Sequence, residues 1–364
     1  MFATFAGGYS RKPNPGLPDV LGDAERGVRE GSLDATGYQA VADAFVREIL
    51  EEQAVVGLAF LGEGGIRTRD RVLPWINGLH GLSAGGDASL PDGEPATRPI
   101  ADREVRWTHP VTVRDWEFAD AETDQLVKQT IIGPYTLAAL ALPDSGPGRA
   151  SLALQLGVAL NQEIRALAAA GCPMVEIDEP AALQIGGDAP EWRAFRAAND
   201  RLTAGLDDQA GLHLSLGLWG GTIDPAGHAA LIDLPYRSYL VDVLAGPTAW
   251  RFINAVPPER GIIAGCADVT TVRMEETEVL VWAMAWAARG GRDSARVGCA
   301  PNGGLFAIGR HFAHRKCQRL GEAVNIAMMG PLQEVAEALD GDPLRSKMAE
   351  LRAMAEAVQA AQRA

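Results

Sequence analysis

The chain has 364 residues, of which 47% are hydrophobic, and this is enough apolar material for one large, elaborated domain. Its formal net charge of −14 at pH 7 argues against a nucleic-acid or anionic-membrane surface. No apolar run is long enough to span a bilayer, and the first residues lack the pattern of a signal peptide, so we expect a cytoplasmic protein that binds a small molecule.

The four cysteines are widely spaced and form no CxxC pair. A chain of this length does not need disulfides to fold, so we expect them to be reduced thiols. Besides small molecules, a second copy of the chain or a partner subunit remains a candidate partner. The cysteines are Cys172, Cys266, Cys299 and Cys317.

The first part of the chain predicts two strands and a long insertion. Residues 3–8 are a short strand candidate, and residues 36–56 have apolar positions at helical spacing. The run 57–62 predicts a second strand, which ends at Glu63 beside glycines. Residues 64–126 are rich in Gly, Pro and Asp and too long for a simple loop, so we predict an insertion with β-type fragments at 105–107 and 111–113.

Strand and helix patterns then alternate along the chain. With the first two strands the count is eight, which predicts a (β/α)8 barrel over residues 1–330 and a C-terminal helical extension over 331–364. The further strands are predicted at 127–132, 174–179, 211–217, 237–242, 261–268 and 295–304, with helices at 149–170, 189–206, 225–232, 248–256, 275–289 and 309–328.

The predicted strands end in polar residues. Asp178 and Glu179 follow the apolar run 174–177 and precede Pro180, which cannot continue a ladder. The carboxyl ends of barrel strands meet at one mouth, where ligands bind, so these acids predict a site; the alternative is that they cap the following helix or pair with an Arg. The other predicted strand-end residues are Glu63, His213, Asp242, Asp268 and Asn302, and His213 can equally be a core histidine.

Five segments resemble cobalamin-independent methionine synthase, in the wider superfamily of uroporphyrinogen decarboxylase. Residues 177–181 (IDEPA) resemble its IDEPAL segment, and residues 133–137 (GPYTL) its GPxTxL turn. Residues 62–63 are similar to its DGE or HGE strand end, 265–269 with Arg273 to GVxDxH…R, and 300–305 to NPDCGL. The resemblance covers about residues 3–328 and matches the catalytic C-terminal half of the family without its N-terminal duplicate barrel.

The resemblance implies a barrel in which a zinc-bound thiolate attacks a methyl or alkyl donor. In the family, zinc is held by an HxC motif, a Glu and the Cys of NPDCGL. His213 matches the His of HxC, but Ser215 and Gly303 stand at the Cys positions, and Val241 or Asp242 at the Glu. Serine and glycine do not replace thiolates on Zn²⁺, so we predict that this zinc site is lost.

Other family positions also differ. Thr270 stands at the proton-donating histidine, Gly8 at a first-strand serine and Ala139 at a tryptophan of the folate surface. Glu63 and Asp178 are retained, and in the family these hold the amino group of the substrate and neighbouring atoms.

We therefore expect a zinc-independent enzyme that transfers or cleaves a methyl or alkyl group on a small amino- or carboxyl-bearing substrate, with a methylfolate-type donor as a candidate. Related epoxyalkane–coenzyme M transferases and uroporphyrinogen decarboxylases use this barrel, so transfer, lyase and decarboxylation chemistry all stay open. The expected catalytic residues are His213, Asp242 and Asp268; the expected substrate-binding residues are Glu63, Asp178, Glu179, Tyr135 and Asn302.

Two alternatives remain. One is a non-catalytic barrel that binds a ligand or forms a subunit. The other is a zinc-dependent methyltransferase with a rebuilt site, formed by His213, Asp242, Cys266 and Cys299, although both cysteines can equally be ordinary core residues.

Overall fold

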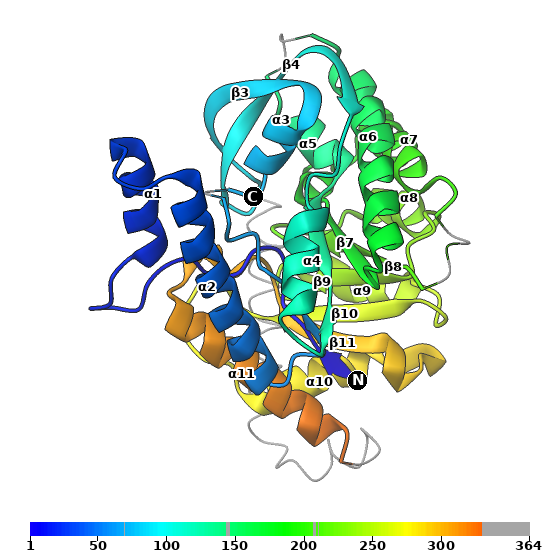
Figure 1. Cartoon of the computed structure of the whole chain (residues 1–364). Helices are drawn as coiled ribbons and strands as arrows, with labels where there is room; N and C mark the ends of the chain where they lie inside the picture. The colour runs from blue at the N-terminus through cyan, green and yellow to red at the C-terminus, as the bar shows by residue number, and fades with distance from the viewer. Residues whose placement is uncertain (69, 143–145, 207–208, 210, 330–364) are drawn as a thin grey trace, which may run out of the picture.

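The computed structural model describes residues 1–364 except 69, 143–145, 207–208, 210 and 330–364 (Figure 1). At its centre a parallel sheet is curled, with the strand order β1-β11-β10-β9-β8-β7-β6. The strands are β1 Phe2–Ala3, β6 Gln129–Ile132, β7 Met174–Asp178, β8 His213–Leu218, β9 Ser238–Asp242, β10 Gly261–Ala267 and β11 Val297–Pro301.

One further strand position joins the two edges of this sheet. β2 (Phe60–Leu61) pairs in parallel with β5 (Leu126–Val127), and Thr4 forms a parallel bridge to Phe60. The chain passes from β5 to β6 through Lys128, whose N–H donates to the Leu61 carbonyl at 2.9 Å. If 126–132 is counted as one strand position, eight parallel positions form the ring in the described residues. The predicted (β/α)8 fold is confirmed.

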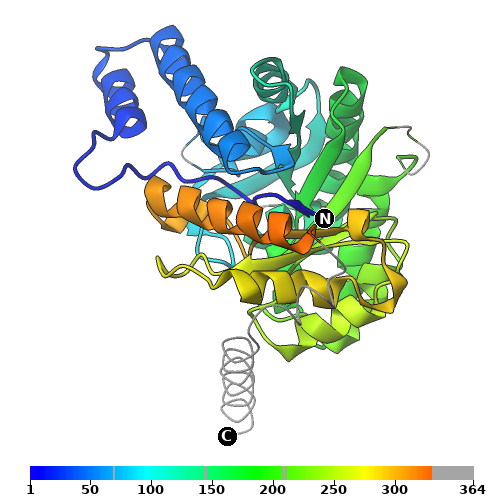
Figure 2. The ribbon, with the colours of Figure 1, turned by 90° about the horizontal axis from the view of Figure 1, so that it is seen from below.

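Helices surround the barrel, and α11 packs on β1 (Figure 2). The sequence of α6 accounts for its position and its end. The helix buries Leu152, Leu156 and Leu160, which recur at helical spacing, and it ends at Gly171, whose φ of 103° suits glycine. The helices are α1 Val20–Glu30, α2 Ala35–Val55, α3 Leu73–Gly78, α4 Val113–Ala121, α5 Pro134–Leu140, α6 Arg149–Ala170, α7 Ala189–Thr203, α8 His228–Ile232, α9 Pro247–Ala255, α10 Thr277–Ala287 and α11 Arg310–Ala327.

The predicted insertion contains an antiparallel hairpin of β3 (Leu79–Ser89) and β4 (Pro95–Trp107). The fragment predicted at 105–107 lies in β4, but the one predicted at 111–113 is wrong, because Val113 begins α4. The predicted extension at 331–364 lies outside the described residues. Within the described part, no helix is both long enough and apolar enough to cross a bilayer.

The interior of the barrel contains a buried ion pair. Lys128 Nζ lies 2.8 Å from Glu176 Oε2 and donates to the Phe5 carbonyl at 2.6 Å, and both charged side chains are fully buried. An apolar cluster that includes Met174, Leu240 and Ile263 also lies in this interior. Because nothing else described pairs with Glu176, the barrel depends on Lys128 to neutralise it.

Lys128→Met is therefore expected to lower the free energy of unfolding by about 3 kcal/mol, because it leaves a buried carboxylate unpaired. Urea unfolding followed by circular dichroism measures this change. Lys12→Met, which removes an exposed ammonium group, is the control and should change stability by less than about 0.5 kcal/mol. Equal effects of the two substitutions would contradict the role of the buried pair.

Candidate functional site

Two of the predicted acids lie at the carboxyl ends of barrel strands. Asp178 is the last residue of β7 and Asp242 the last of β9, and both are buried. Pro180 ends the β7 segment as expected, by opening a short 3-10 helix, Pro180–Gln184. Glu63 lies two residues beyond β2 and is also buried. The mouth of the barrel therefore gathers carboxyl groups, as the sequence predicted.

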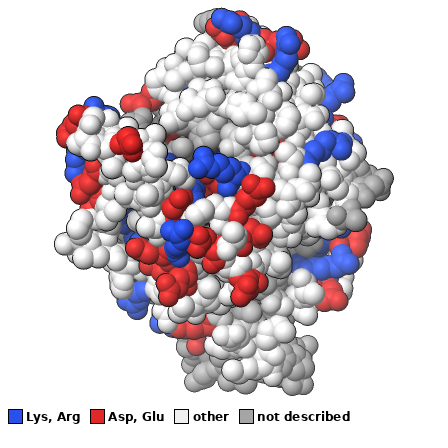
Figure 3. Space-filling model, in the orientation of Figure 1, with Lys and Arg blue, Asp and Glu red and all other residues white. Residues whose placement is uncertain are grey.

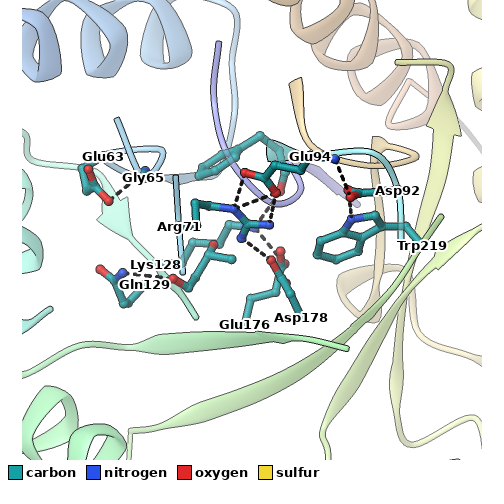
Figure 4. Close-up of polar contacts among 12 residues, drawn as sticks. Glu63, Gly65, Arg71, Asp92, Glu94, Lys128, Gln129, Glu176, Asp178 and Trp219 are labelled. Carbon is teal, nitrogen blue, oxygen red and sulfur yellow. Dashed lines mark hydrogen bonds and ion pairs between the residues drawn. The ribbon is translucent and has the colours of Figure 1, made fainter. Parts of the chain in front are cut away.

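The centre of the mouth is Arg71, which sequence reasoning missed (Figure 4). Its guanidinium donates to Glu94 through Nε at 2.9 Å and Nη2 at 2.7 Å, and to Asp178 Oδ2 through Nη1 at 2.5 Å. All three side chains are buried. Two carboxyl groups thus share one cation, and Asp178 Oδ1 has no hydrogen-bond partner among the described residues. Burial raises the pKa of Asp178 well above its usual value, although Arg71 opposes this shift.

The turn of the β3–β4 hairpin covers this centre. Glu94 comes from the turn, and Asp92 on the same turn accepts a hydrogen bond at 3.1 Å from the indole N–H of Trp219 (Figure 4). Trp219 follows β8 and is fully buried. A Cβ at Gly220 would lie 2.8 Å from the Asp92 side chain, so the turn and the end of β8 are in close contact. The insertion therefore contributes directly to the mouth of the barrel.

Glu63 lies on the other side of Arg71, beside a small cavity of about 40 Å³. Glu63 Oε1 accepts from the Gly65 N–H at 2.8 Å, whereas Oε2 is buried without a partner in the described structure. Thr130 Oγ1 lines the same cavity and also lacks a partner there. Burial, with Asp115 adding to it, raises the pKa of Glu63 to about 7. Two buried polar atoms without partners at one small cavity indicate a place for a small hydrogen-bonding group, such as a water molecule or an ammonium group.

Asp242 and Asn302 are brought together across the mouth. Asn302 Nδ2 donates to Asp242 Oδ1 at 3.2 Å, and the same oxygen accepts from the Leu244 and Ala245 N–H groups. Burial raises the pKa of Asp242 to about 6, despite these donors. Asp268 lies in the next loop, half-buried, where its Oδ1 accepts from the Thr270 N–H at 2.8 Å. These three predicted residues therefore lie at the mouth.

Two predicted substrate-binding residues have structural roles instead. Glu179 accepts from the Tyr135 N–H at 3.0 Å and from the Thr136 N–H at 2.7 Å, so it caps the start of α5. The Tyr135 hydroxyl donates to Glu191 on α7 at 2.5 Å, outside the barrel. The helix that Glu179 caps precedes it in the chain, whereas the alternative was a cap on the helix that follows. The other alternative, pairing with an arginine, is found at Asp178, which contacts Arg71. The Tyr135 hydroxyl points to α7 and not into the mouth.

The predicted position of His213 is also wrong. His213 is the first residue of β8, paired in register with Met174 at the start of β7, and therefore lies at the end of the barrel opposite the mouth. Its Nε2 lies 2.8 Å from Ser238 Oγ. The residue of β8 that aligns with Asp178 at the mouth is Gly217, four positions later. His213 and Ser215, which align with the HxC motif, therefore lie below the mouth, in the interior of the barrel.

The residues at the mouth do not fit the zinc ion that the resemblance implies. A Cβ at Gly217 would lie 2.0 Å from Cζ3 of Trp219, and a Cβ at Gly303 would lie 3.2 Å from Cδ1 of the same indole. The indole therefore fills the space above both glycines, where ligand side chains would have to project. The described residues contain no group of three or more His, Cys, Asp or Glu side chains that could hold a metal. The Cys299 thiol points away from the barrel interior, toward the Leu320 carbonyl of α11 at 3.8 Å, so a rebuilt site with this thiol is not formed.

A cavity of about 400 Å³ opens beside Arg71 and the hairpin turn. The basic residues Arg11 and Lys12 line it as well. Arg11 donates to Glu25 at 2.5 Å and to the Thr68 carbonyl at 3.0 Å, and Lys12 Nζ donates to the Ala307 carbonyl at 2.6 Å. On the face in Figure 3, acidic and basic side chains intermingle near the middle, and the described residues form no continuous basic patch there.

This fold, with buried carboxyl groups at the carboxyl edge of a parallel barrel, defines the class of enzyme-type (β/α)8 barrels. Residues 19–198 match the family model described as "Cobalamin-independent synthase, Catalytic domain". The chain thus carries a cobalamin-independent methionine synthase-like domain, as its motifs predicted.

Individual relatives agree with this assignment. The 5-methyltetrahydropteroyltriglutamate–homocysteine methyltransferase of Aeromonas salmonicida (strain A449) is 30% identical over 155 residues, which cover 42% of this chain and 21% of that protein. The enzyme of the same name from Synechococcus sp. (strain JA-2-3B'a(2-13)) is 31% identical over 155 residues, with the same coverage. The chain therefore matches only about a fifth of the length of these relatives.

A solved structure shows the same fold. It is a B12-independent methionine synthase from Shewanella sp. W3-18-1 in complex with selenomethionine, with a TM-score of 0.73 and 18% sequence identity. The alignment covers 90% of this chain and 97% of that one. The barrel and its decorations are thus shared over nearly the whole length of both chains.

Proposed function

We propose that this protein is a zinc-independent methyltransferase-type enzyme, which moves a methyl group from a methylfolate-type donor to a small substrate of the homocysteine type. The observation that carries the proposal is the buried Arg71–Asp178 pair beside Glu63, with two carboxyl oxygens that have no partner in the described structure. The names of the relatives support the donor and the acceptor.

The charges at the mouth favour an amino-bearing substrate. Arg71 is shared between Glu94 and Asp178, so the cluster has one more carboxyl group than cations. An ammonium group placed at Asp178 Oδ1 or Glu63 Oε2 would neutralise this excess and satisfy atoms that are otherwise costly to bury. A substrate carboxylate would then lie in the cavity beside Arg71, Arg11 and Lys12.

Asp242 is the proposed proton acceptor. Its pKa of about 6 lies close to neutral pH, and a general base is most effective when its pKa is near the working pH. All three donors described above contact Oδ1, which holds the carboxyl group in one orientation. A thiol substrate would lose its proton to Asp242 as its sulfur forms a bond to the methyl group and the bond between this methyl group and N5 of the folate donor breaks. The departing nitrogen keeps the electron pair of that bond and takes up a proton, which gives the methylated sulfur and tetrahydrofolate. Asn302 and Asp268 lie beside the Asp242 carboxylate. His213 has no part in this proposal, since it lies at the opposite end of the barrel.

Methyl transfer is expected to persist after dialysis of the purified protein against a chelator, because the Trp219 indole fills the region where the family's ligands would project. The assay measures methylation of homocysteine with a methyltetrahydrofolate donor, alongside the zinc content of the protein. Activity that disappears with stoichiometric zinc and returns when zinc is added would contradict zinc independence. Binding of both substrates without turnover would instead support a non-catalytic barrel.

A further inference from the structure

A large cavity in the described residues lies at the opposite end of the barrel from the mouth. Its volume is about 770 Å³, which is within the range of small-molecule sites. We call it the floor pocket, because the residues at the start of β1, β2, β5, β7, β8, β9 and β10 line it. Neither the resemblance nor the proposed methyl transfer gives it a role.

The inner wall of the floor pocket is apolar and aromatic. Phe2 and Phe60 contact each other edge to face, with ring centroids 5.5 Å apart, and Met174 lies beside them at the bottom of the barrel interior. Leu126 stands at the edge of the pocket with 53% of its surface exposed. An exposed large apolar residue that continues into an aromatic wall indicates a surface that favours an apolar ligand.

The rim of the floor pocket is cationic. Arg237, Arg260 and Arg296 line it, and Glu259 is the acidic side chain among the lining residues. Arg260 is fixed in place, because its Nη1 donates to the Ile232 and Leu234 carbonyls and to the Tyr239 hydroxyl. Three arginines and one glutamate among the lining residues give the rim an excess of positive side chains, in a chain with a net charge of −14, and this local feature suits an anion.

His213 forms the polar end of the floor pocket. Ser238 Oγ lies 2.8 Å from His213 Nε2 and donates to Ser215 Oγ, also at 2.8 Å, so a chain of hydrogen bonds runs from the pocket into the barrel. Burial, together with Arg237, lowers the pKa of His213 to about 4. At neutral pH the imidazole is therefore uncharged, and the attraction for an anion comes from the arginines at the rim.

We propose that the floor pocket binds a small molecule with an apolar body and a single carboxylate. The body lies against Phe2, Phe60 and Met174, and the carboxylate lies at the rim beside Arg237 and Arg296. This site is separate from the mouth, so the proposal does not depend on the methyl-transfer reaction.

Naphthaleneacetate and its uncharged counterpart naphthaleneethanol are suitable probes, because they share an aromatic body and differ in the carboxylate. Calorimetric titration of the full chain is expected to show saturable binding of the acid, at least about tenfold tighter than the alcohol, as expected for one charge-assisted contact. The double variant Arg237→Gln/Arg296→Gln should weaken binding of the acid by about tenfold or more and leave binding of the alcohol nearly unchanged. Arg251→Gln, which removes an exposed arginine of α9 that does not line the pocket, is the matched control.

Ala295→Trp tests the location, because this exposed residue lines the pocket and a bulky side chain there would fill it. It should abolish binding of both probes without changing the thermal unfolding midpoint appreciably. Equal affinity for acid and alcohol, or unchanged binding in the Trp variant, would overturn the proposal. So would the absence of saturable binding to the full chain.

Discussion

Arg71→Met is expected to lower the free energy of unfolding by about 5 kcal/mol, which is the upper end of the range for breaking a buried ion pair. The substitution leaves two carboxyl groups, those of Glu94 and Asp178, without their cation in a site where the side chains are at most 7% exposed. Removal of one partner from a buried pair is costly because the remaining charge has lost its solvent and gained nothing in return. Denaturant unfolding monitored by tryptophan fluorescence measures the change.

Two further variants test whether the loss of stability comes from the buried cluster or from the loss of any arginine. Arg103→Met removes an exposed guanidinium that lies 3.9 Å from Asp102 and should change stability by less than about 0.5 kcal/mol. Glu94→Gln in the Arg71→Met background should recover part of the loss, since it removes one unpaired charge. A loss below about 1 kcal/mol for Arg71→Met, or no recovery in the double variant, would show that the cluster does not hold the hairpin on the barrel.

The barrel could be predicted from the sequence because its signals are local. Runs such as 174–177 are mainly apolar until two acids and a proline end them, and the helices between them carry apolar residues at helical spacing. For the same reason Asp178 and Asp242 were placed correctly at strand ends. The acids that end a buried strand are visible in the sequence itself.

His213 shows where this reasoning fails. Alternation along 211–217 predicts a strand and the faces of its side chains, but it does not say which end of the strand reaches the mouth. The register with β7 decides this, and it places His213 beside Met174 at the start of the strand. A short motif match then fixed the wrong residue, because Gly217, four positions later and with the same side-chain parity, is the residue that aligns with Asp178 at the mouth.

The central residue of the site, Arg71, could not be predicted because its partners are far away in the chain. Asp178 is 107 residues away, and Glu94 comes from the turn of an inserted hairpin whose position on the barrel has no local signal. The available hint was a cationic residue a few positions after Glu63, in a segment rich in glycine. The position of Trp219 over two glycines is likewise a consequence of packing, which no pattern in the sequence reports.

Asp242→Asn is expected to lower kcat/KM for methyl transfer by about 10²- to 10⁴-fold, the usual range for loss of a general base. The substitution keeps the shape of the site, because the hydrogen bonds of Asp242 described above all reach Oδ1, which asparagine retains. In the unchanged protein, kcat/KM should rise with pH through about 6 as this carboxyl group ionises, and this rise should be absent in the variant. Asp224→Asn, which changes a half-buried acid that caps a short helix, is the matched control.

The pH dependence of stability is an independent measure of the protonation of Asp242, and its direction can be predicted. The pKa of Asp242 is about 6 in the folded protein and near 3.8 when unfolded, so between these values the folded state binds more protons. The free energy of unfolding should therefore fall as pH rises from about 4 to 6, by about 3 kcal/mol from this residue. In Asp242→Asn that part of the fall disappears, so the variant gains stability relative to the unchanged protein as pH rises. If both proteins show the same pH dependence of stability and of kcat/KM, Asp242 neither holds a proton in the folded site nor accepts one during the reaction.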